Sequence, residues 1–313
     1  MDGQNNHLER ERERQYYNMQ IQQMQYVSTL PRLDGFGAQF QNIIFDILFT
    51  HVMTPAMQYV FPSNVIHMKF EHNYGNDPTF SDRLIRLMNL NTHFNFKTET
   101  ATTTATATAT ATATTTVKRS VTFYNGVKNY AFCETNLTRL LETTGFKSMQ
   151  QLFFEGKRTP HDAEFYNVAV HVRKYSASDM RIHRRMNEPT SYYVNVMRFI
   201  TAGYKGTKPI RFHIYSQGNV VEFAEFAAFA NNAEVEVVMH LDASVEDTFN
   251  GLVFADALVT SASSFSYVAA ILTHGTVFYK KFWHKPSMKW IVGDNLPPNN
   301  ANTNVKLRSM RYN

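Results

Sequence analysis

Two segments of the sequence decide the fold class, VAVHVR at residues 168–173 and ADALVTSASSF at residues 255–265. In each, a run of apolar residues leads directly into polar residues that are able to hold an anion. The carboxyl ends of neighbouring strands in a parallel sheet lie along one crevice, and ligands of such sheets bind there. Two strand ends of this kind in one half of the chain therefore predict a site for a nucleotide sugar.

Strands and helices alternate around these two segments. We expect strands over 166–173, 210–216, 234–239, 257–260 and 276–279, and helices over 191–202, 220–230, 245–254 and 265–273. Gly203 and Gly275 follow two of these helices, and glycine is a common residue just past a helix end. Strict alternation over this length predicts a parallel, doubly wound sheet.

The first half of the chain is less regular but opens in the same way. A short strand is expected over 26–30, followed by a glycine turn over 34–39 and an apolar helix over 40–52. Strand, glycine turn and helix together begin an α/β unit. We therefore expect two α/β domains, over 26–160 and 161–290, flanked by a polar N-terminal arm over 1–25 and a C-terminal tail over 291–313 that runs back along the first domain or frays.

A low-complexity segment interrupts the first domain. Residues 101–116 are almost pure alternation of Thr and Ala, without a large side chain to bury. Such a segment cannot offset the entropy lost on ordering. We interpret it as an insertion in a surface loop.

Composition limits the classes of partner and compartment. The 31 Lys and Arg exceed the 26 Asp and Glu by a formal charge of +5, which suits an anionic ligand but falls short of a nucleic-acid-binding surface. Cys133 is the only cysteine, which excludes an intrachain disulfide and a thiolate metal site. No run of 18 apolar residues and no signal-peptide pattern is present, so we expect a soluble, cytoplasmic protein without a membrane span.

His171 and Arg173 end the first deciding segment. They stand two residues apart on the expected strand and so point to the same face. An arginine is not buried without a partner, so we expect Arg173 to leave the sheet end towards an anion, where a guanidinium grips phosphate oxygens in pairs. The alternative is that Arg173 pairs with a neighbouring acid and that His171 is a histidine of the core. The two residues taken alone favour this alternative.

Serines surround the other strand end. Four of them open the helix expected after residue 260, where the free N–H groups of a helix N-terminus hold anions: Ser261, Ser263, Ser264 and Ser266. Serine is also an ordinary N-cap, but one cap needs only one serine. For Gly35 and Gly37, a tight turn that needs positive φ and a ligand contact are equally acceptable explanations.

Two groups of residues carry weaker signals. The basic cluster of His183, Arg184 and Arg185 indicates a solvated loop more than a phosphate site. The remaining histidines do not have the spacing of metal ligands, so no metal site is expected among them: His161, His240, His274 and His284.

The motifs together resemble those of the GDP-fucose-dependent fucosyltransferases, the group of α1,2-, α1,6- and protein O-fucosyltransferases. Residues 170–174 resemble the family's H-x-R-R segment, and residues 34–39 resemble the glycine loop of its acceptor-side domain. Residues 255–256 followed by 263–265 resemble its A-D…S-S-F segment. The resemblance is closest over 167–279. It implies a GT-B-type architecture of two Rossmann-like α/β domains, the first on the acceptor side and the second binding the nucleotide sugar.

The resemblance also implies a role for each matching residue. Arg173 would hold the β-phosphate and stabilise the charge of the departing nucleotide, while His171 and Asp256 would face the guanine. The rest of the donor-binding set would be Lys174, Ser263, Ser264, Phe265, Gly35, Gly37 and Gln39. Asp179 is our candidate for the general base that inverting transfer requires, ahead of Glu71 and Asp34.

The chain departs from the family in two places. Lys174 stands where the family has a second arginine, and a lysine does not replace an arginine in a paired contact. Asp179 stands further from the motif than the family's acidic residue does.

The expected function is metal-independent, inverting transfer of L-fucose from GDP-fucose to a hydroxyl of a glycan acceptor, with no further cofactor. The alternatives are a glycosyltransferase with another donor, such as a xylose or rhamnose nucleotide, and a non-catalytic protein that binds nucleotides or sugars. A nucleic-acid-binding or scaffold protein is less favoured, because Glu9, Glu11 and Glu13 offset the arginines of the N-terminal arm.

Overall fold

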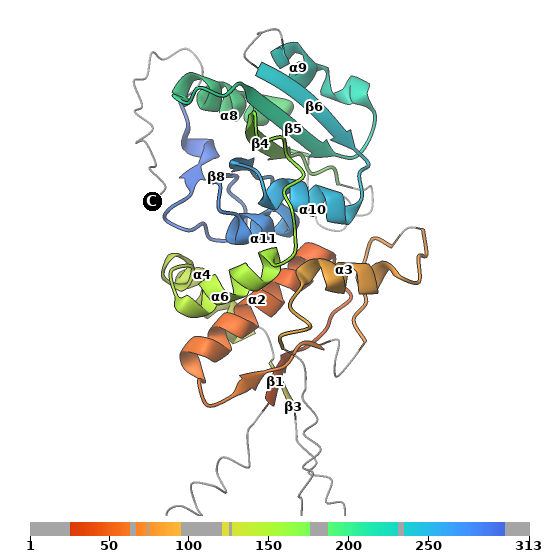
Figure 1. The fold of residues 1–313 in the computed structure, drawn as a ribbon, viewed down its shortest axis with the longest axis vertical. Coiled ribbons are helices and arrows are strands. Elements are labelled where there is room, and N and C mark those ends of the chain that lie inside the picture. The colour runs from red at the N-terminus through yellow and green to blue at the C-terminus, as the bar shows by residue number, and fades with distance from the viewer. Residues whose placement is uncertain are drawn as a thin grey trace, which may run out of the picture.

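The computed structural model describes residues 26–62, 67–73, 75–94, 121–124, 127–175, 187–230 and 235–297. They form two lobes, drawn one above the other in Figure 1. The arm over 1–25, the Thr-Ala segment over 101–116 and the tail beyond 297 lie outside the described residues.

The second lobe contains a six-stranded sheet in which every pair of neighbours is parallel. Its order is β6-β5-β4-β7-β8-β9. The strands are β4 (Tyr166–His171), β5 (Ile210–Ser216), β6 (Val235–Leu241), β7 (Ala257–Val259), β8 (Thr276–Tyr279) and β9 (Ile291–Val292). From β4 the chain builds outward through β5 and β6 and then returns to the other side of β4, which is the order 3-2-1-4-5-6 of the Rossmann fold. The predicted parallel, doubly wound sheet is confirmed.

Helices cover both faces of this sheet. They are α8 (Thr190–Gly203), α9 (Ala224–Ala227) between the 3₁₀ turns η2 (Val220–Phe223) and η3 (Ala228–Ala230), α10 (Val245–Val253) and α11 (Ser264–Leu272). Val168 and Val170 of β4 pack with α8 and α9, whereas Ala169 packs with α10 and α11. Alternate residues of β4 thus face opposite helical layers, which explains the nearly continuous apolar sequence of this strand.

The first lobe has a smaller parallel sheet with the order β2-β1-β3. Its strands are β1 (Tyr26–Thr29), β2 (Gln58–Tyr59) and β3 (Val121–Tyr124), and its helices are α2 (Phe36–Met53), α3 (Phe80–Met88), α4 (Val127–Thr135), α5 (Leu137–Leu140) and α6 (Thr144–Phe154). The opening strand and the apolar helix after it are confirmed. Both lobes therefore have the predicted α/β class with parallel sheets.

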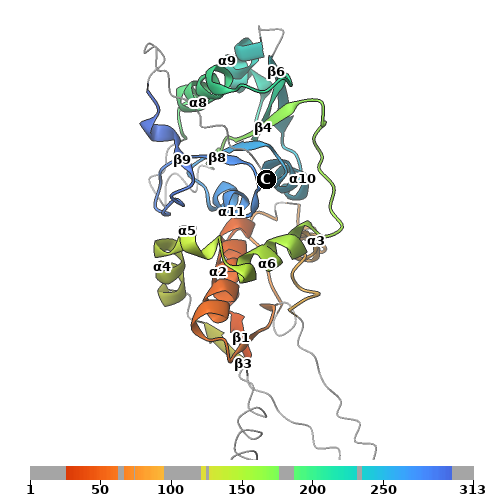
Figure 2. The same ribbon diagram turned by 60° about the vertical axis from the view of Figure 1, so that its left-hand side comes forward.

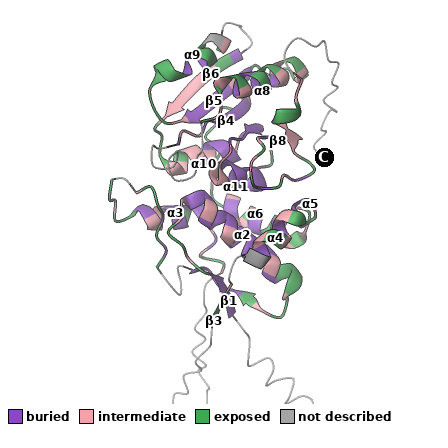
Figure 3. Cartoon of the chain, turned by 180° about the vertical axis from the view of Figure 1, so that it is seen from behind, coloured by how far each residue is buried: buried purple, intermediate pink, exposed green. Residues whose placement is uncertain are grey.

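One hydrophobic core joins the two lobes. Helix α2 is buried along most of its length, and it packs on α11, which lies between α2 and the larger sheet (Figures 2 and 3). The ring of Phe36 meets that of Phe249 edge-on at 5.2 Å and lies 6.1 Å from that of Phe265. The first turn of α2 is thereby fixed against the start of α11.

Gly37 makes this contact possible. A Cβ atom on Gly37 would lie 2.4 Å from Cα of Phe265 and 2.5 Å from its backbone nitrogen. Only a residue without a side chain lets the two helix backbones approach this closely. The predicted glycine turn over 34–39 is therefore wrong, because Gly37 is helical and Gly35 is the N-cap of α2 with a φ of −63°.

The structure differs from the other sequence predictions at three helices or strands. Gly203 is the last residue of α8, not a terminator beyond it, since the N–H of Tyr204 still bonds to Ile200 O. The single helix expected over 220–230 is divided between 3₁₀ and α turns. The C-terminal tail begins with β9, which pairs with β8 in the larger sheet. No helix in the described part of the chain has the length and apolar character needed to cross a membrane.

Candidate functional site

A pocket of about 290 Å³ opens at the carboxyl ends of β4 and β5, beside the start of α11. β4 is the strand from which the sheet is built in both directions, so the pocket lies at the topological switch point, where ligands of open α/β sheets bind. Eight of the residues predicted from the sequence line it: Gly35, Gly37, His171, Arg173, Lys174, Ser263, Ser264 and Phe265.

Two helix N-termini meet at this pocket. Helix α2 begins after Gly35, which has no side chain to cap the N–H groups of the first turn. Helix α11 begins after Ser263, whose Oγ accepts a hydrogen bond from the N–H of Phe265 at 3.3 Å. Each helix N-terminus carries a partial positive charge and unpaired N–H groups. The pocket is therefore suited to bind phosphate groups.

His171 joins the two strands at the switch point. Its Nδ1 lies 2.7 Å from Oγ of Ser261, directly beyond β7. Burial, and the nearby charge of Arg173, lower the pKa of His171 to about 3. His171 is thus neutral near pH 7 and forms part of the pocket wall, with Nδ1 already bonded to protein.

Arg173 and Lys174 follow β4 at the pocket. The guanidinium carbon of Arg173 lies 5.4 Å from the ring centre of Tyr175, whose hydroxyl donates to Ala262 O at 2.5 Å. Nζ of Lys174 lies 3.1 Å from Oε2 of Glu222 in a partly exposed ion pair. Two cations therefore stand at the same pocket as the two helix N-termini.

The first lobe supplies the opposite wall. Glu71, His72 and Phe80 of this lobe line the pocket. Trp283, which lies between β8 and β9 in the second lobe, also lines it, with 53% of its surface exposed. Among the described residues that line the pocket, Glu71 is the one carboxylate. The preferred general base, Asp179, lies outside the described residues together with the basic cluster at 183–185, and Asp34 does not line the pocket.

The predicted guanine contact of Asp256 is wrong. Asp256 directly precedes β7, at the amino end of the sheet, and its Oδ2 accepts a hydrogen bond from the N–H of Asn167 at 2.8 Å. The carboxylate connects the starts of β4 and β7, at the other end of the strands from the pocket.

The predicted donor contact of Gln39 is also wrong. Its side chain is buried in the first lobe, where Nε2 donates to Asp34 O at 2.8 Å and to Lys69 O at 2.7 Å. Gln39 therefore holds together the two loops that flank the start of α2 and does not reach the pocket.

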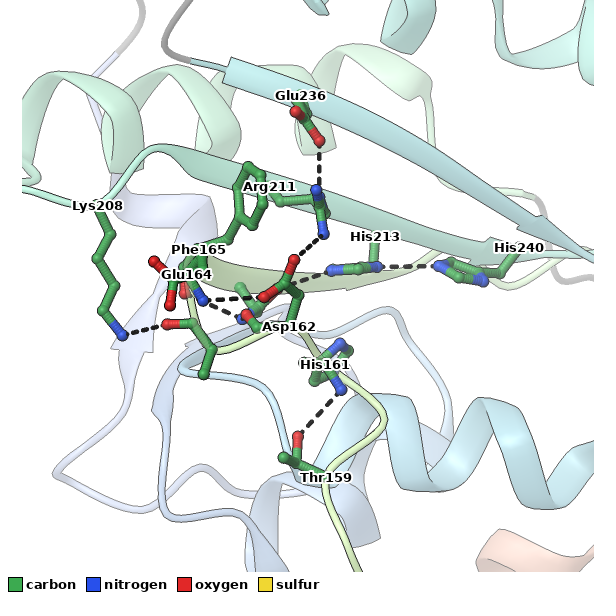
Figure 4. Close-up of polar contacts among 12 residues, drawn as sticks. Thr159, His161, Asp162, Glu164, Phe165, Lys208, Arg211, His213, Glu236 and His240 are labelled. Atoms are coloured by element: carbon green, nitrogen blue, oxygen red, sulfur yellow. Dashed lines mark hydrogen bonds and ion pairs between the residues drawn. The ribbon is translucent and has the colours of Figure 1, made fainter.

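A second polar cluster lies between the larger sheet and α10 (Figure 4). His213 shares hydrogen bonds with His240 at 3.0 Å and with Asn167 at 3.1 Å, and Nε2 of His161 lies 2.7 Å from Gly251 O. Within the described part of the chain, no three His, Cys, Asp or Glu side chains are arranged to hold a metal ion. None of these three histidines lines the pocket, although the ring of His240 stacks at 4.5 Å on that of Tyr215, which does line it.

The pocket also contains residues that sequence reasoning missed. Phe36, Phe80, Tyr175 and Trp283 give it aromatic walls. They come from separate loops and helix starts, and no spacing in the sequence connects them. Phe36 alone carried a signal, because it lies within the glycine segment singled out above.

Comparison with known proteins gives only distant likenesses. No family model matches the chain, and no curated protein matches its sequence. Among solved structures, the fucosyltransferase NodZ from Bradyrhizobium aligns at 12% identity over 79% of this chain and 92% of that one, with a TM-score of 0.34. The E. coli heptosyltransferase WaaC with ADP-2-deoxy-2-fluoro heptose aligns at 12% identity over 86% and 92%, with a TM-score of 0.36. A variant of Arabidopsis thaliana FUT1 in complex with GDP aligns at 11% identity over 88% and 75%, with a TM-score of 0.39.

Proposed function

We propose that this protein is a glycosyltransferase that binds a nucleotide sugar in the pocket at the switch point and transfers the sugar to a hydroxyl of a glycan acceptor. The observation that carries the proposal is the meeting of two helix N-termini with Arg173 and Lys174 around one pocket. Four positively polarised groups in one place are matched to a ligand with two phosphates.

The chemistry of transfer needs this electrostatic arrangement. When the bond between the sugar and the phosphate breaks, negative charge develops on the departing nucleoside diphosphate. Fixed N–H groups and a guanidinium stabilise that charge most where water is excluded, and they do so without a metal ion. A hydroxyl acceptor must also lose a proton, for which Asp179 and Glu71 are the carboxylate candidates from the sequence.

We propose GDP-fucose as the donor, with inversion at the anomeric carbon. This finer assignment rests on the resemblance of residues 170–174 and 263–265 to the fucosyltransferase motifs. Because Asp256 lies at the other end of the sheet, only His171 remains of the two residues expected to face guanine. A glycosyltransferase with another nucleotide sugar is therefore the second candidate.

Thermal unfolding with GDP, UDP, ADP and CMP tests the donor site. A nucleotide at about 100 times its Kd stabilises the folded state by about 2.7 kcal/mol, a shift of several degrees in Tm. We expect the Arg173→Ala variant to lose this stabilisation, and the variant of an exposed arginine away from the pocket, Arg139→Ala, to keep it. Absence of stabilisation by every nucleotide would overturn the donor site.

Turnover is tested with the corresponding nucleotide sugars. Slow hydrolysis, in which water takes the place of the acceptor, releases a nucleoside diphosphate that chromatography quantifies. GDP release from GDP-fucose alone supports the fucosyl assignment, and release from another donor changes the sugar but keeps the class. Binding without release from any donor supports the non-catalytic alternative.

A further inference from the structure

A buried histidine connects the pocket to a carboxylate of the first lobe. His284 lies in the loop between β8 and β9, and the imidazole is 3% exposed. Its Nδ1 lies 2.6 Å from Oε1 of Glu134 on α4, and its Nε2 lies 3.0 Å from Oγ of Ser264. Ser264 is the first residue of α11 and lines the pocket. Three segments far apart in the sequence thus form a Ser–His–Glu line that ends at the site.

A neighbouring indole fixes the position of the imidazole proton. Nε1 of Trp283 donates a hydrogen bond to Nε2 of His284 at 3.1 Å. An indole N–H is only a donor, so Nε2 carries a lone pair and the proton is on Nδ1, facing the carboxylate of Glu134. This is the tautomer in which a histidine takes a proton from a serine hydroxyl through Nε2.

The surroundings hold the ring in this orientation. The ring of Tyr267 stacks on the imidazole at 4.6 Å, and the hydroxyl of Tyr279 donates to His284 O at 2.5 Å. The hydroxyl of Tyr130 lies 2.7 Å from Nδ1 and accepts a hydrogen bond from Gln41. Among the described residues, the titratable side chains packed around His284 are therefore one carboxylate, Glu134, and three tyrosines. Glu134 is the group that balances a positive charge on the ring.

We propose that Ser264, His284 and Glu134 form a proton relay that deprotonates the acceptor hydroxyl during sugar transfer. The inference rests on the proposed function and adds a proton acceptor to it. Glu134 belongs to the first lobe, while Arg173 and Lys174 approach from the end of β4 in the second lobe. The relay and the groups that hold the phosphates thus reach the pocket from different elements.

The acceptor oxygen forms a bond to the anomeric carbon, and the bond from that carbon to the phosphate oxygen breaks with its electron pair on the departing diphosphate. The acceptor proton passes to Oγ of Ser264 while the serine proton passes to the lone pair of Nε2 of His284. Nε2 thereby gives up the hydrogen bond from the indole N–H of Trp283, a side chain that is 53% exposed and can turn this N–H to water. The resulting imidazolium donates from Nδ1 to Glu134, which remains a carboxylate.

The first test is independent of any substrate. In protein with ¹⁵N-labelled histidine, the signal of His284 is assigned by its loss in the His284→Gln variant. We expect a proton on Nδ1 near pH 7, strongly deshielded, with the deshielding reduced in Glu134→Gln. A proton on Nε2 at this pH would overturn the relay.

The second test measures the rate of nucleoside diphosphate release from the nucleotide sugar that is turned over, as a function of pH. A general base contributes about 10²- to 10⁴-fold, so we expect losses in this range for Ser264→Ala and for His284→Gln. The remaining rate should no longer depend on the ionisation of a general base, so its pH profile should flatten relative to that of the parent. Ser264→Thr keeps a hydroxyl and should restore both the rate and its pH dependence.

Matched variants separate the relay from the fold and from the donor site. His274→Gln and Ser287→Ala lie outside the pocket and should retain the parent rate and profile. Of the relay variants, His284→Gln and Glu134→Gln should keep the nucleotide-dependent shift in Tm, because neither residue lines the donor pocket. If they retain the pH profile and Glu71→Gln or Asp179→Asn removes it, the relay is wrong while the glycosyltransferase stands.

Discussion

The contact between the two helix N-termini makes Gly37→Ala the most informative single substitution. The added Cβ would lie 2.4 Å from Cα of Phe265, 2.5 Å from its nitrogen and 2.8 Å from the carbonyl carbon of Ser264. Ordinary contacts of a Cβ begin near 3.4 Å, so the two helices must separate by about 1 Å at this point. The atoms that would be displaced are backbone, so no rotamer change can relieve the clash.

The expected loss of stability is moderate. Overpacking of a well-packed contact costs about 1–3 kcal/mol. Alanine recovers up to about 1 kcal/mol of helix propensity relative to glycine, less in a first turn. The net loss is therefore about 1–2 kcal/mol, which corresponds to roughly 2–8 °C in Tm for a chain of this size class.

The substitution also tests the anion site. A displacement of α2 moves its uncapped N–H groups away from those of α11, so we expect nucleotide affinity to fall together with Tm. Gly75→Ala is the control, since a Cβ there has no heavy atom within 4 Å. A Gly37→Ala protein with the Tm and nucleotide affinity of the parent would refute the packing role of Gly37.

Four further predictions concern pH, metal and the inserted segment. Burial lowers the pKa of His171 and of His213 to about 3, so the unfolded chain binds more protons and the free energy of unfolding should fall as the pH drops from about 6.5 towards 3, measured by urea denaturation. Burial raises the pKa of Asp46 to about 6, which acts in the opposite sense, so Asp46→Asn should gain stability over the parent as the pH rises from about 4 to 6. EDTA should leave turnover unchanged, and a loss that Mn²⁺ restores would contradict the metal-free mechanism. Deletion of residues 101–116 should leave nucleotide binding and Tm nearly unchanged, whereas a protein that no longer folds would show that the segment is structural.

The larger sheet could be predicted because the secondary structure that its local sequence favours is the one that the folded lobe contains. Strands such as β4 and β5 are apolar runs buried on both faces, and each is separated from the next by a helix-length segment. β9 was missed because a strand of two residues has no pattern of its own and exists through its pairing with β8.

The site was partly predictable for a similar reason. Arg173 and Ser263 lie in the segments that follow the carboxyl ends of β4 and β7, and parallel pairing brings such positions to one edge. Asp256 precedes its strand, so the same rule places it at the opposite edge, and the guanine contact that the family motif implied for it is wrong. Glu134, His284 and Ser264 belong to a helix, a loop and a second helix that come together only because the two lobes pack on each other. The positions of these residues in the sequence therefore gave no sign of their contact.

The shared core limits how the site works. Phe36 and Phe40 from the first lobe lie in one cluster with Phe249 from the second, and Phe265 packs against it. Full burial of a phenylalanine is worth about 1.5–3 kcal/mol, so exposing these four rings would cost roughly 6–12 kcal/mol, comparable to the stability of a whole domain. This core holds the two helix N-termini together before a ligand arrives. In the proposed transfer, a preformed anion site of this kind would need no reorganisation as charge develops on the departing diphosphate, which is the condition under which fixed dipoles contribute most to catalysis.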